Sequence, residues 1–191
     1  MGKLIVSMNL TLDGYMAGAD GELDWHCMSW TDEMSTALCK RLGQAGAILL
    51  GRLTYEAMQA YWSGKADDPY CAPGDYVFAF MVNSYPKIVC SKTLPGVTWK
   101  NARLLRAPLE TGIRSEKRRN DKPLMVYGSN QLVQTIIKAN LIDEYQLWMH
   151  PVILGKGKRL FESEQDARLK LVNTEKFGSG IVLLCYQVGD R

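Results

Sequence analysis

Short apolar runs alternate with amphipathic stretches through the first two-thirds of the chain. A short apolar run predicts a buried strand, and a longer periodic or capped stretch predicts a helix. Strand regions are expected at 3–8, 47–50, 87–90, 98–105 and 124–127. Helices are expected at 31–43, 53–61, 75–83, 108–119 and 129–139.

The pattern changes to strand-like alternation in the last third of the chain. Apolar and polar residues alternate over 143–150, and two further strand-like stretches, 168–176 and 181–188, flank a Gly-Ser-Gly sequence at 178–180. A glycine-rich turn between two such stretches predicts a β-hairpin. The order of elements therefore predicts an α/β fold with a mixed, mainly parallel, twisted sheet, helices on both faces and an antiparallel C-terminal strand pair.

The composition is that of one globular domain over 1–191. The 191 residues are 47% hydrophobic and 23% charged, and a chain of this length can bury its own core. The longest uncharged stretch, 123–137, is broken by polar residues and is shorter than the roughly 20 apolar residues that cross a bilayer. We therefore expect no membrane span.

The net charge of +3 is too small for a dedicated nucleic-acid-binding protein. One basic cluster stands in the chain, and two acidic residues interrupt it. We expect it to be the solvated end of a helix rather than an anion site. The cluster consists of Arg114, Lys117, Arg118, Arg119 and Lys122.

Cysteine and histidine usage argues against a disulfide scaffold and against a metal site. The five cysteines are odd in number and form no CxxC pair, and the chain has two histidines. His150 precedes Pro151 on a predicted strand, where we expect a structural role. Reduced thiols and a first strand that starts near the N-terminus lead us to expect a cytoplasmic protein.

A long glycine-punctuated segment, 9–24, follows the first strand. Asp-Gly pairs stand at 13–14 and 20–21, and these are turn signals. Loops of this length inside a compact domain are usually functional. Asp13 therefore has two alternative roles: it orients substrate or relays a proton, or it only shapes the turn.

Three predicted strands end in small or polar residues before a helix or turn. Gly51 and Arg52 follow the second strand, Ser91 and Lys92 follow the third, and Gly128 follows the strand at 124–127. Glycine lets a ligand approach the backbone, the free amides of a following helix attract an anion, and a cation pairs with phosphate. Three such ends predict a ligand with separated phosphates, such as a dinucleotide, although the GxGxxG and Walker A motifs are absent.

The chain resembles the dihydrofolate reductase superfamily, in particular stand-alone proteins similar to the C-terminal reductase domain of the bifunctional riboflavin-biosynthesis deaminase-reductase. The matching stretches keep the family order and cover nearly the whole chain. They are VSMNLTLDGY at 6–15, LGRLTYE at 50–56, KIVCSK at 87–92, YGS at 127–129, LIDE at 141–144 and HPVILGKG at 150–157.

The resemblance implies a dihydrofolate-reductase-like fold, NADPH as cofactor and a homodimer formed through the C-terminal strands. It implies that a loop over the nicotinamide includes Gly14 and Ala17, and that Ser91 and Lys92 lie near the 2′-phosphate. It implies that Gly51, Arg52 and Thr54 hold phosphates. It also implies that the pyrophosphate is held by Gly128, Ser129, Asn130 and Gln131. The family often has two consecutive glycines, joined by a cis peptide, where Gly128 and Ser129 stand here.

The activity expected from the resemblance is hydride transfer from NADPH to a small planar heterocycle, either pterin-like or aminopyrimidine-like. Trp25, Tyr55 and Tyr127 are candidates to contact that heterocycle, although packing explains each of them as well. The proton would come from Asp13 or from water. Folate reductases place a carboxylate on the first helix where alignment puts Ser35. The alternative is therefore a dinucleotide-binding regulatory protein without turnover.

Overall fold

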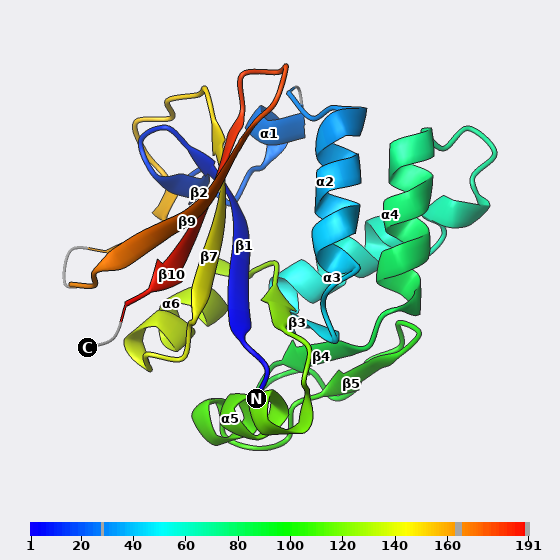
Figure 1. The fold of residues 1–191 in the computed structure, drawn as a ribbon. Coiled ribbons are helices and arrows are strands. Elements are labelled where there is room, and N and C mark those ends of the chain that lie inside the picture. The colour runs from blue at the N-terminus through cyan, green and yellow to red at the C-terminus, as the bar shows by residue number, and fades with distance from the viewer. Residues whose placement is uncertain (28, 163–165, 190–191) are drawn as a thin grey trace.

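The molecule is built on one twisted eight-stranded sheet (Figure 1). The structure is a computed structural model and describes residues 1–27, 29–162 and 166–189. The strands of this sheet are β1 (Leu4–Thr11), β3 (Ala47–Gly51), β4 (Lys87–Cys90), β5 (Ala102–Leu104), β6 (Leu124–Val126), β7 (Glu144–His150), β9 (Leu169–Lys176) and β10 (Val182–Val188). Their spatial order is β5-β4-β3-β6-β1-β7-β10-β9.

The strands from β5 to β7 are parallel, and β10 runs antiparallel to both β7 and β9. A turn closes the β9–β10 hairpin, where the Gly180 amide donates to the Phe177 carbonyl at 3.0 Å. The predicted fold class is confirmed: the sheet is mainly parallel, and its C-terminal strands form the antiparallel pair.

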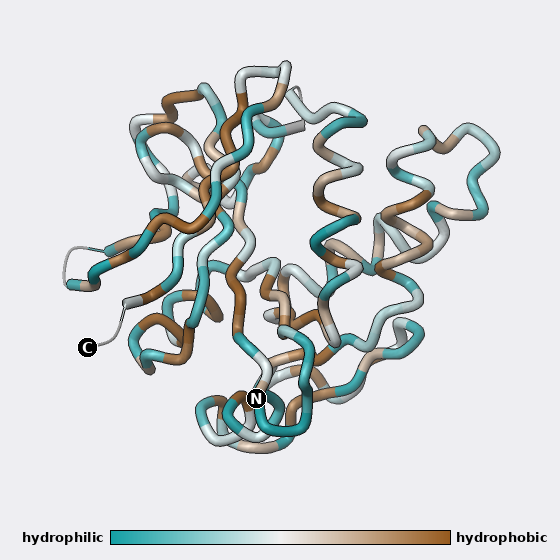
Figure 2. The backbone as a smooth tube through the Cα atoms, in the orientation of Figure 1, coloured by the Kyte–Doolittle hydropathy of each residue, from teal (hydrophilic) through white to brown (hydrophobic). Residues whose placement is uncertain are grey.

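Helices cover both faces of the sheet. They are α1 (Asp24–Cys27), α2 (Asp32–Leu42), α3 (Arg52–Trp62), α4 (Pro73–Ser84), α5 (Leu109–Arg119) and α6 (Asn130–Lys138), with a short 3₁₀ helix at Lys65–Asp67. Residues of α5 and α6 pack with Leu4 and Val6 of β1, whereas residues of α2 and α4 pack with Ile5. Alternate β1 side chains therefore enter two different cores. Figure 2 shows hydrophobic stretches along the central strands.

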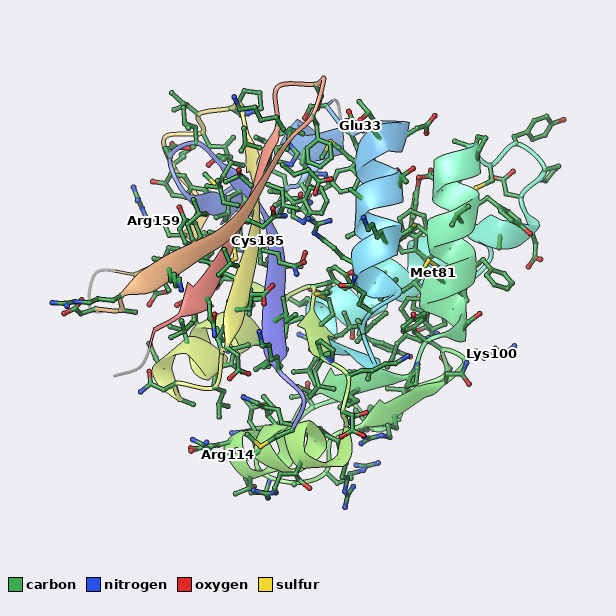
Figure 3. All side chains as sticks on the ribbon, in the orientation of Figure 1. Glu33, Met81, Lys100, Arg114, Arg159 and Cys185 are labelled. Atoms are coloured by element: carbon green, nitrogen blue, oxygen red, sulfur yellow. The ribbon has the colours of Figure 1, made fainter. Side chains whose placement is uncertain are left out.

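The helix at 31–43 forms as the sequence predicts. Thr31 caps it, because its hydroxyl accepts a hydrogen bond from the Met34 amide at 3.4 Å, and Asp32 and Glu33 place negative charge in the first turn. Glu33 also accepts a hydrogen bond from the Gly178 amide at 3.2 Å, which ties the start of α2 to the β9–β10 hairpin (Figure 3).

The segment 9–24 is less irregular than its glycines predict. β1 continues through Thr11, and Tyr15–Ala17 forms strand β2, which pairs with β8 (Lys158–Arg159). The loop prediction is wrong over these residues because the strand partner of β2 lies about 140 positions later in the chain. A local sequence pattern carries no information about such a partner.

The basic cluster at the end of α5 is not fully solvated. Lys117 is buried, and its ammonium contacts the Asp143 carboxylate at 2.5 Å and the Leu141 carbonyl at 3.3 Å. The expectation of a solvated helix end is therefore wrong for Lys117, although Arg114, on the same helix, is exposed. In the described ranges, no helix combines the length and the apolar character needed to span a membrane.

Candidate functional site

The three strand ends singled out in the sequence lie side by side at one edge of the sheet. β3 lies between β4 and β6, and all three strands are parallel, so their carboxyl ends meet at the same edge. Gly51 is in register with Cys90 of β4. On the other side, the Gly51 amide donates a hydrogen bond to the Gly128 carbonyl at 2.9 Å. This is the edge at which parallel sheets bind ligands.

Gly51, Thr54, Gly128 and Ser129 form a tightly packed group that we call the cradle. A Cβ atom on Gly51 would stand 2.9 Å from the Ser129 amide nitrogen, and one on Gly128 would stand 2.7 Å from the Thr54 hydroxyl oxygen. Gly128 also has a φ of +125°, and the peptide bond from Gly128 to Ser129 is cis. Side chains at the two glycine positions would therefore separate the two strand-to-helix turns.

Two helices begin at the cradle. Arg52 is the first residue of α3 and Asn130 the first of α6, so both amino-terminal ends present free backbone amides at this edge. The Asn130 carboxamide donates to the Arg159 carbonyl at 3.2 Å, and Gln131 is exposed. Helix amino-terminal ends are sites where phosphate groups bind.

Two cations stand at the same edge. The Arg52 guanidinium lies 3.2 Å from the Glu56 carboxylate, and both side chains are a little over two-fifths exposed. Lys92 is exposed in the turn after β4. The Ser91 hydroxyl accepts hydrogen bonds from the amides of residues 93 and 94 at 3.1 and 3.0 Å, which fixes that turn. Both cations can therefore reach an anion in solvent.

The Asp13 carboxylate holds two segments of the chain together. It accepts a hydrogen bond from the Thr11 hydroxyl at 2.6 Å and others from the amides of Leu154 and Gly155 at 3.3 and 2.8 Å. The Thr11 hydroxyl, followed by these amides, lowers the pKa of Asp13 below its usual value. These contacts agree with the loop-shaping alternative, because a carboxyl that stays ionised is a poor proton donor at neutral pH.

Gly14 and Ala17 lie in the ribbon formed by β2, the turn that precedes it and its partner β8. Gly14 has a φ of +85°, as its turn requires, and Ala17 is buried in β2. A Cβ atom on Gly157 would collide with the Ala17 carbonyl, so β2 is closely packed against residues 151–157, which precede β8 and which we call the strap. The structure thus places both residues in a ribbon that α6 also contacts, since Gln134 donates to the Arg159 carbonyl at 2.9 Å.

The three aromatic candidates for substrate contact have different surroundings. Trp25 is buried, and its indole nitrogen has no hydrogen-bond partner among the described residues. Tyr55 packs in the core, and its hydroxyl accepts hydrogen bonds from the amides of Thr98 and Trp99 at 3.0 and 3.2 Å. These contacts indicate a structural role for Tyr55.

Tyr127 follows β6 immediately before the cradle. Its ring meets that of Phe78 edge-on at 6.5 Å, and its hydroxyl is buried without a partner among the described residues. Burial raises the pKa of the Tyr127 hydroxyl, which therefore stays protonated. The structure places this hydroxyl inside the molecule.

Asn9, within the segment predicted to be a loop, and His150, predicted to be structural, form a polar contact near this edge. His150 Nε2 lies 3.1 Å from Asn9 Oδ1, at the carboxyl ends of β7 and β1. The alternation of apolar and polar residues beyond position 8 is the signal that could have placed Asn9 on a strand.

Two cavities lie away from the cradle. One, of about 460 Å³, lies between the end of α6, β7 and the C-terminal strands, and includes Ile137, Tyr145 and Leu169 in its lining. The other, of about 410 Å³, lies between α2 and α4 and includes Ser35 and Cys39. Neither is lined by a cradle residue. The described residues contain no group of three or more side chains suited to hold a metal ion.

The fold is that of dihydrofolate reductase and related proteins. The structure resembles dihydrofolate reductase from Enterococcus faecalis, solved with NADP(H), with a TM-score of 0.60 and 16% identity over 99% of this chain and 98% of that one. It resembles a putative riboflavin biosynthesis protein from Shewanella sp. PV-4 with a TM-score of 0.78 and 23% identity over the whole of both chains.

The sequence comparison identifies the family. Residues 2–183 match the model of the RibD C-terminal domain, and the chain belongs to that family. It is 33% identical over 185 residues to the uncharacterized protein YyaP of Bacillus subtilis strain 168, covering 96% of this chain and 94% of the relative. The resemblance stated from the sequence motifs is confirmed.

Proposed function

We propose that the protein is an NADPH-dependent reductase that transfers a hydride to a small planar heterocycle, pterin-like or aminopyrimidine-like. The observation that carries the proposal is the cradle, where Gly51 and Gly128 leave the backbone bare between two helix amino-terminal ends. The family supports it, because a structural neighbour from Thermotoga maritima is described as a 5-amino-6-(5-phosphoribosylamino)uracil reductase. The neighbour from Enterococcus faecalis was solved with NADP(H).

The residues at the edge fit a dinucleotide with three separate anionic groups. Under this proposal, the pyrophosphate is held by the amides of α3 and α6 together with Thr54, Ser129, Asn130 and Gln131. Arg52, Ser91 and Lys92 face the 2′-phosphate, and the ribbon with Gly14 and Ala17 covers the nicotinamide. Bound NADPH supplies the hydride, and the protein contributes position and a water-poor surface.

We propose that water, and not Asp13, supplies the proton for the reduced substrate. Asp13 already accepts hydrogen bonds from Thr11 and from two strap amides, so its ionised form is the stable one. Its role in this proposal is to hold the 9–24 segment against the strap. Trp25 and Tyr127 remain the proposed aromatic contacts of the substrate, while Tyr55 supports the turn before β5.

Titration of the purified protein with NADPH and with NADH, followed by nicotinamide fluorescence, tests the cofactor. We expect NADPH to bind at least about tenfold more tightly, because Arg52 and Lys92 would contact the 2′-phosphate. The variants R52A and K92A should reduce this preference and leave NADH binding unchanged. The control R114A removes an exposed arginine from α5. Failure of both cofactors to bind below millimolar concentration would refute the proposal.

A second candidate function is a dinucleotide-binding regulatory protein without turnover. Ser35 stands on α2 where folate reductases carry a carboxylate, and its hydroxyl already accepts a hydrogen bond from the Trp30 indole at 2.9 Å. NADPH binding without oxidation across a panel of dihydropterins and aminopyrimidines would favour this function over the reductase.

We further propose that the protein works as a cytoplasmic homodimer. Free thiols support the location of the protein in a reducing compartment. They are those of Cys39, Cys71, Cys90 and Cys185. Leu171 on the edge strand β9 is about half exposed, and its side chain lies on the same face as Tyr186 of β10. This apolar face supports an interface formed by the C-terminal strands.

A further inference from the structure

The face of β1 that is turned toward α2 becomes polar as the strand approaches its carboxyl end. Ile5 packs in the apolar core, but Ser7 and Asn9 follow it on the same face. The Ser7 hydroxyl accepts a hydrogen bond from the Trp148 indole at 3.1 Å. Asn9 is half-buried and contacts His150, the last residue of β7. Apolar side chains would fill a core at positions 7 and 9 equally well, so core packing does not explain the polar residues there.

His150 is fully enclosed by its neighbours. It is 1% exposed, its Nδ1 lies 3.0 Å from the Ser29 hydroxyl, and the Trp25 ring meets it edge-on at 5.1 Å. Burial, with a smaller contribution from the nearby His26, lowers the pKa of His150 to about 4. The imidazole is therefore neutral at neutral pH, with one nitrogen that donates and one that accepts.

The orientation of the Asn9 carboxamide indicates which nitrogen of His150 carries the hydrogen. A carboxamide oxygen can only accept, so Nε2, which faces Asn9 Oδ1, must be the donor. The Ser29 hydroxyl, which also lies 3.4 Å from the His26 carbonyl, then gives its single hydrogen to Nδ1. The Asn9 NH₂ group is consequently turned away from the ring. Among the described residues, it donates no hydrogen bond within the usual distance.

Asn9 lies beside the cradle. β1 and β6 are parallel, and Val6 is in register with Val126. Asn9 lies three residues beyond Val6, and Ser129 lies three residues beyond Val126. The free NH₂ group of Asn9 is therefore at the same edge of the sheet as the site proposed for the dinucleotide, on the face that α2 covers.

We propose that the Asn9 carboxamide recognises the substrate by donating a hydrogen bond to a carbonyl or ring-nitrogen acceptor, and that His150 is the positioning residue that fixes the carboxamide in this orientation. The inference rests on the proposed function and adds the chemical class of the recognised group. Pterins and aminopyrimidinones both carry such acceptors on a planar ring.

The hydrogen position on His150 tests the geometry without any substrate. We expect ring-¹⁵N NMR at pH 7 to show a neutral His150 with its hydrogen on Nε2. Because the chain has only two histidines, the spectrum of H150Q assigns both rings. A hydrogen on Nδ1 would overturn the proposal, since Asn9 would then have to turn its NH₂ group toward the ring and its oxygen outward.

Substitutions at Asn9 test recognition, with 7,8-dihydropterin and 5,6-diaminouracil as probes. N9D keeps the shape but presents an acceptor, and N9L presents neither donor nor acceptor. We expect both to weaken binding of whichever probe the wild type binds by about tenfold or more, and to leave NADPH affinity within about twofold. Unchanged probe binding in N9D, or a wild type that binds NADPH but neither probe, would overturn the proposal.

Substitutions at His150 separate positioning from a purely structural role. The Gln side chain of H150Q can still donate to Asn9 Oδ1, whereas that of H150L cannot. We expect H150Q to keep probe affinity within about threefold and H150L to lose it as N9L does. Equal probe affinities for H150L and wild type would overturn the positioning role. Failure of the wild type to bind NADPH would instead refute the proposed function. The NMR result would still report the orientation of the Asn9 carboxamide.

Discussion

Gly51 shows at the scale of one residue why the cradle requires glycine. A methyl group there would stand 2.9 Å from the Ser129 nitrogen, which belongs to backbone and cannot rotate away. We expect G51A to lower the free energy of unfolding by about 1 to 3 kcal/mol and to abolish NADPH binding, because the two strand ends must separate. Urea unfolding and fluorescence titration measure the two effects.

The matched control is G96A, because a Cβ atom on Gly96 meets nothing within 4 Å. We expect this substitution to leave NADPH affinity unchanged and stability within about 0.5 kcal/mol. If G51A binds NADPH as the wild type does, close contact between the two turns is not required for the site.

His150 makes stability depend on pH. Its pKa in the folded protein is about 4, below the usual value of 6.5, so between these values the unfolded chain binds a proton that the folded protein excludes. The free energy of unfolding should therefore fall as pH decreases from 6.5 to 4, by about 2 to 3 kcal/mol from this residue. The groups that act on the ring are His26 and, through His26, Asp24.

Urea unfolding at several pH values measures this dependence. H150Q should flatten the curve between pH 6.5 and 4, and H26Q serves as the comparison that isolates the contribution of His26. An H150Q curve as steep as that of the wild type would contradict the assignment to His150.

At the scale of elements, Lys117 joins α5 to the amino-terminal ends of β1 and β7. Its ammonium contacts the Asp143 carboxylate, which also accepts the Leu4 amide at 2.6 Å. We expect K117M to lower the free energy of unfolding by about 2 kcal/mol or more, because Asp143 loses its counterion in a partly buried place. Chemical denaturation measures the loss.

R118A is the control for this prediction, because Arg118 is the next residue of α5 and is exposed. Its effect should stay within about 0.5 kcal/mol. Equal stabilities of K117M and R118A would show that the buried pair contributes nothing to the attachment of α5.

At the scale of the whole molecule, the exposed apolar face of β9 and β10 predicts self-association. We expect the wild type to sediment as a dimer and L171D to shift toward the monomer, because a carboxylate cannot be buried there without a partner. The control K170D changes the neighbouring residue, whose side chain points to the other face of the strand. A monomeric wild type, or equal sedimentation of L171D and K170D, would contradict this interface.

The sequence predicted the parts of the site that depend on local pattern. A buried strand, a glycine and a helix start are consecutive in the chain at Gly51 and at Gly128, so each half of the cradle could be recognised alone. The sequence did not predict that the Tyr55 hydroxyl binds the amides of Thr98 and Trp99. It also did not predict the burial of Lys117. Both depend on partners more than 20 positions away.

The order of strands and helices, and therefore the α/β class, followed from the sequence alone, because hydrophobic period and turn residues act over short distances. Only the tertiary structure decided which strand ends are neighbours. Asn9 and His150 are 141 positions apart and meet because β1 and β7 pair in parallel. Register between distant strands depends on packing across the whole sheet, and no short stretch of sequence contains that information.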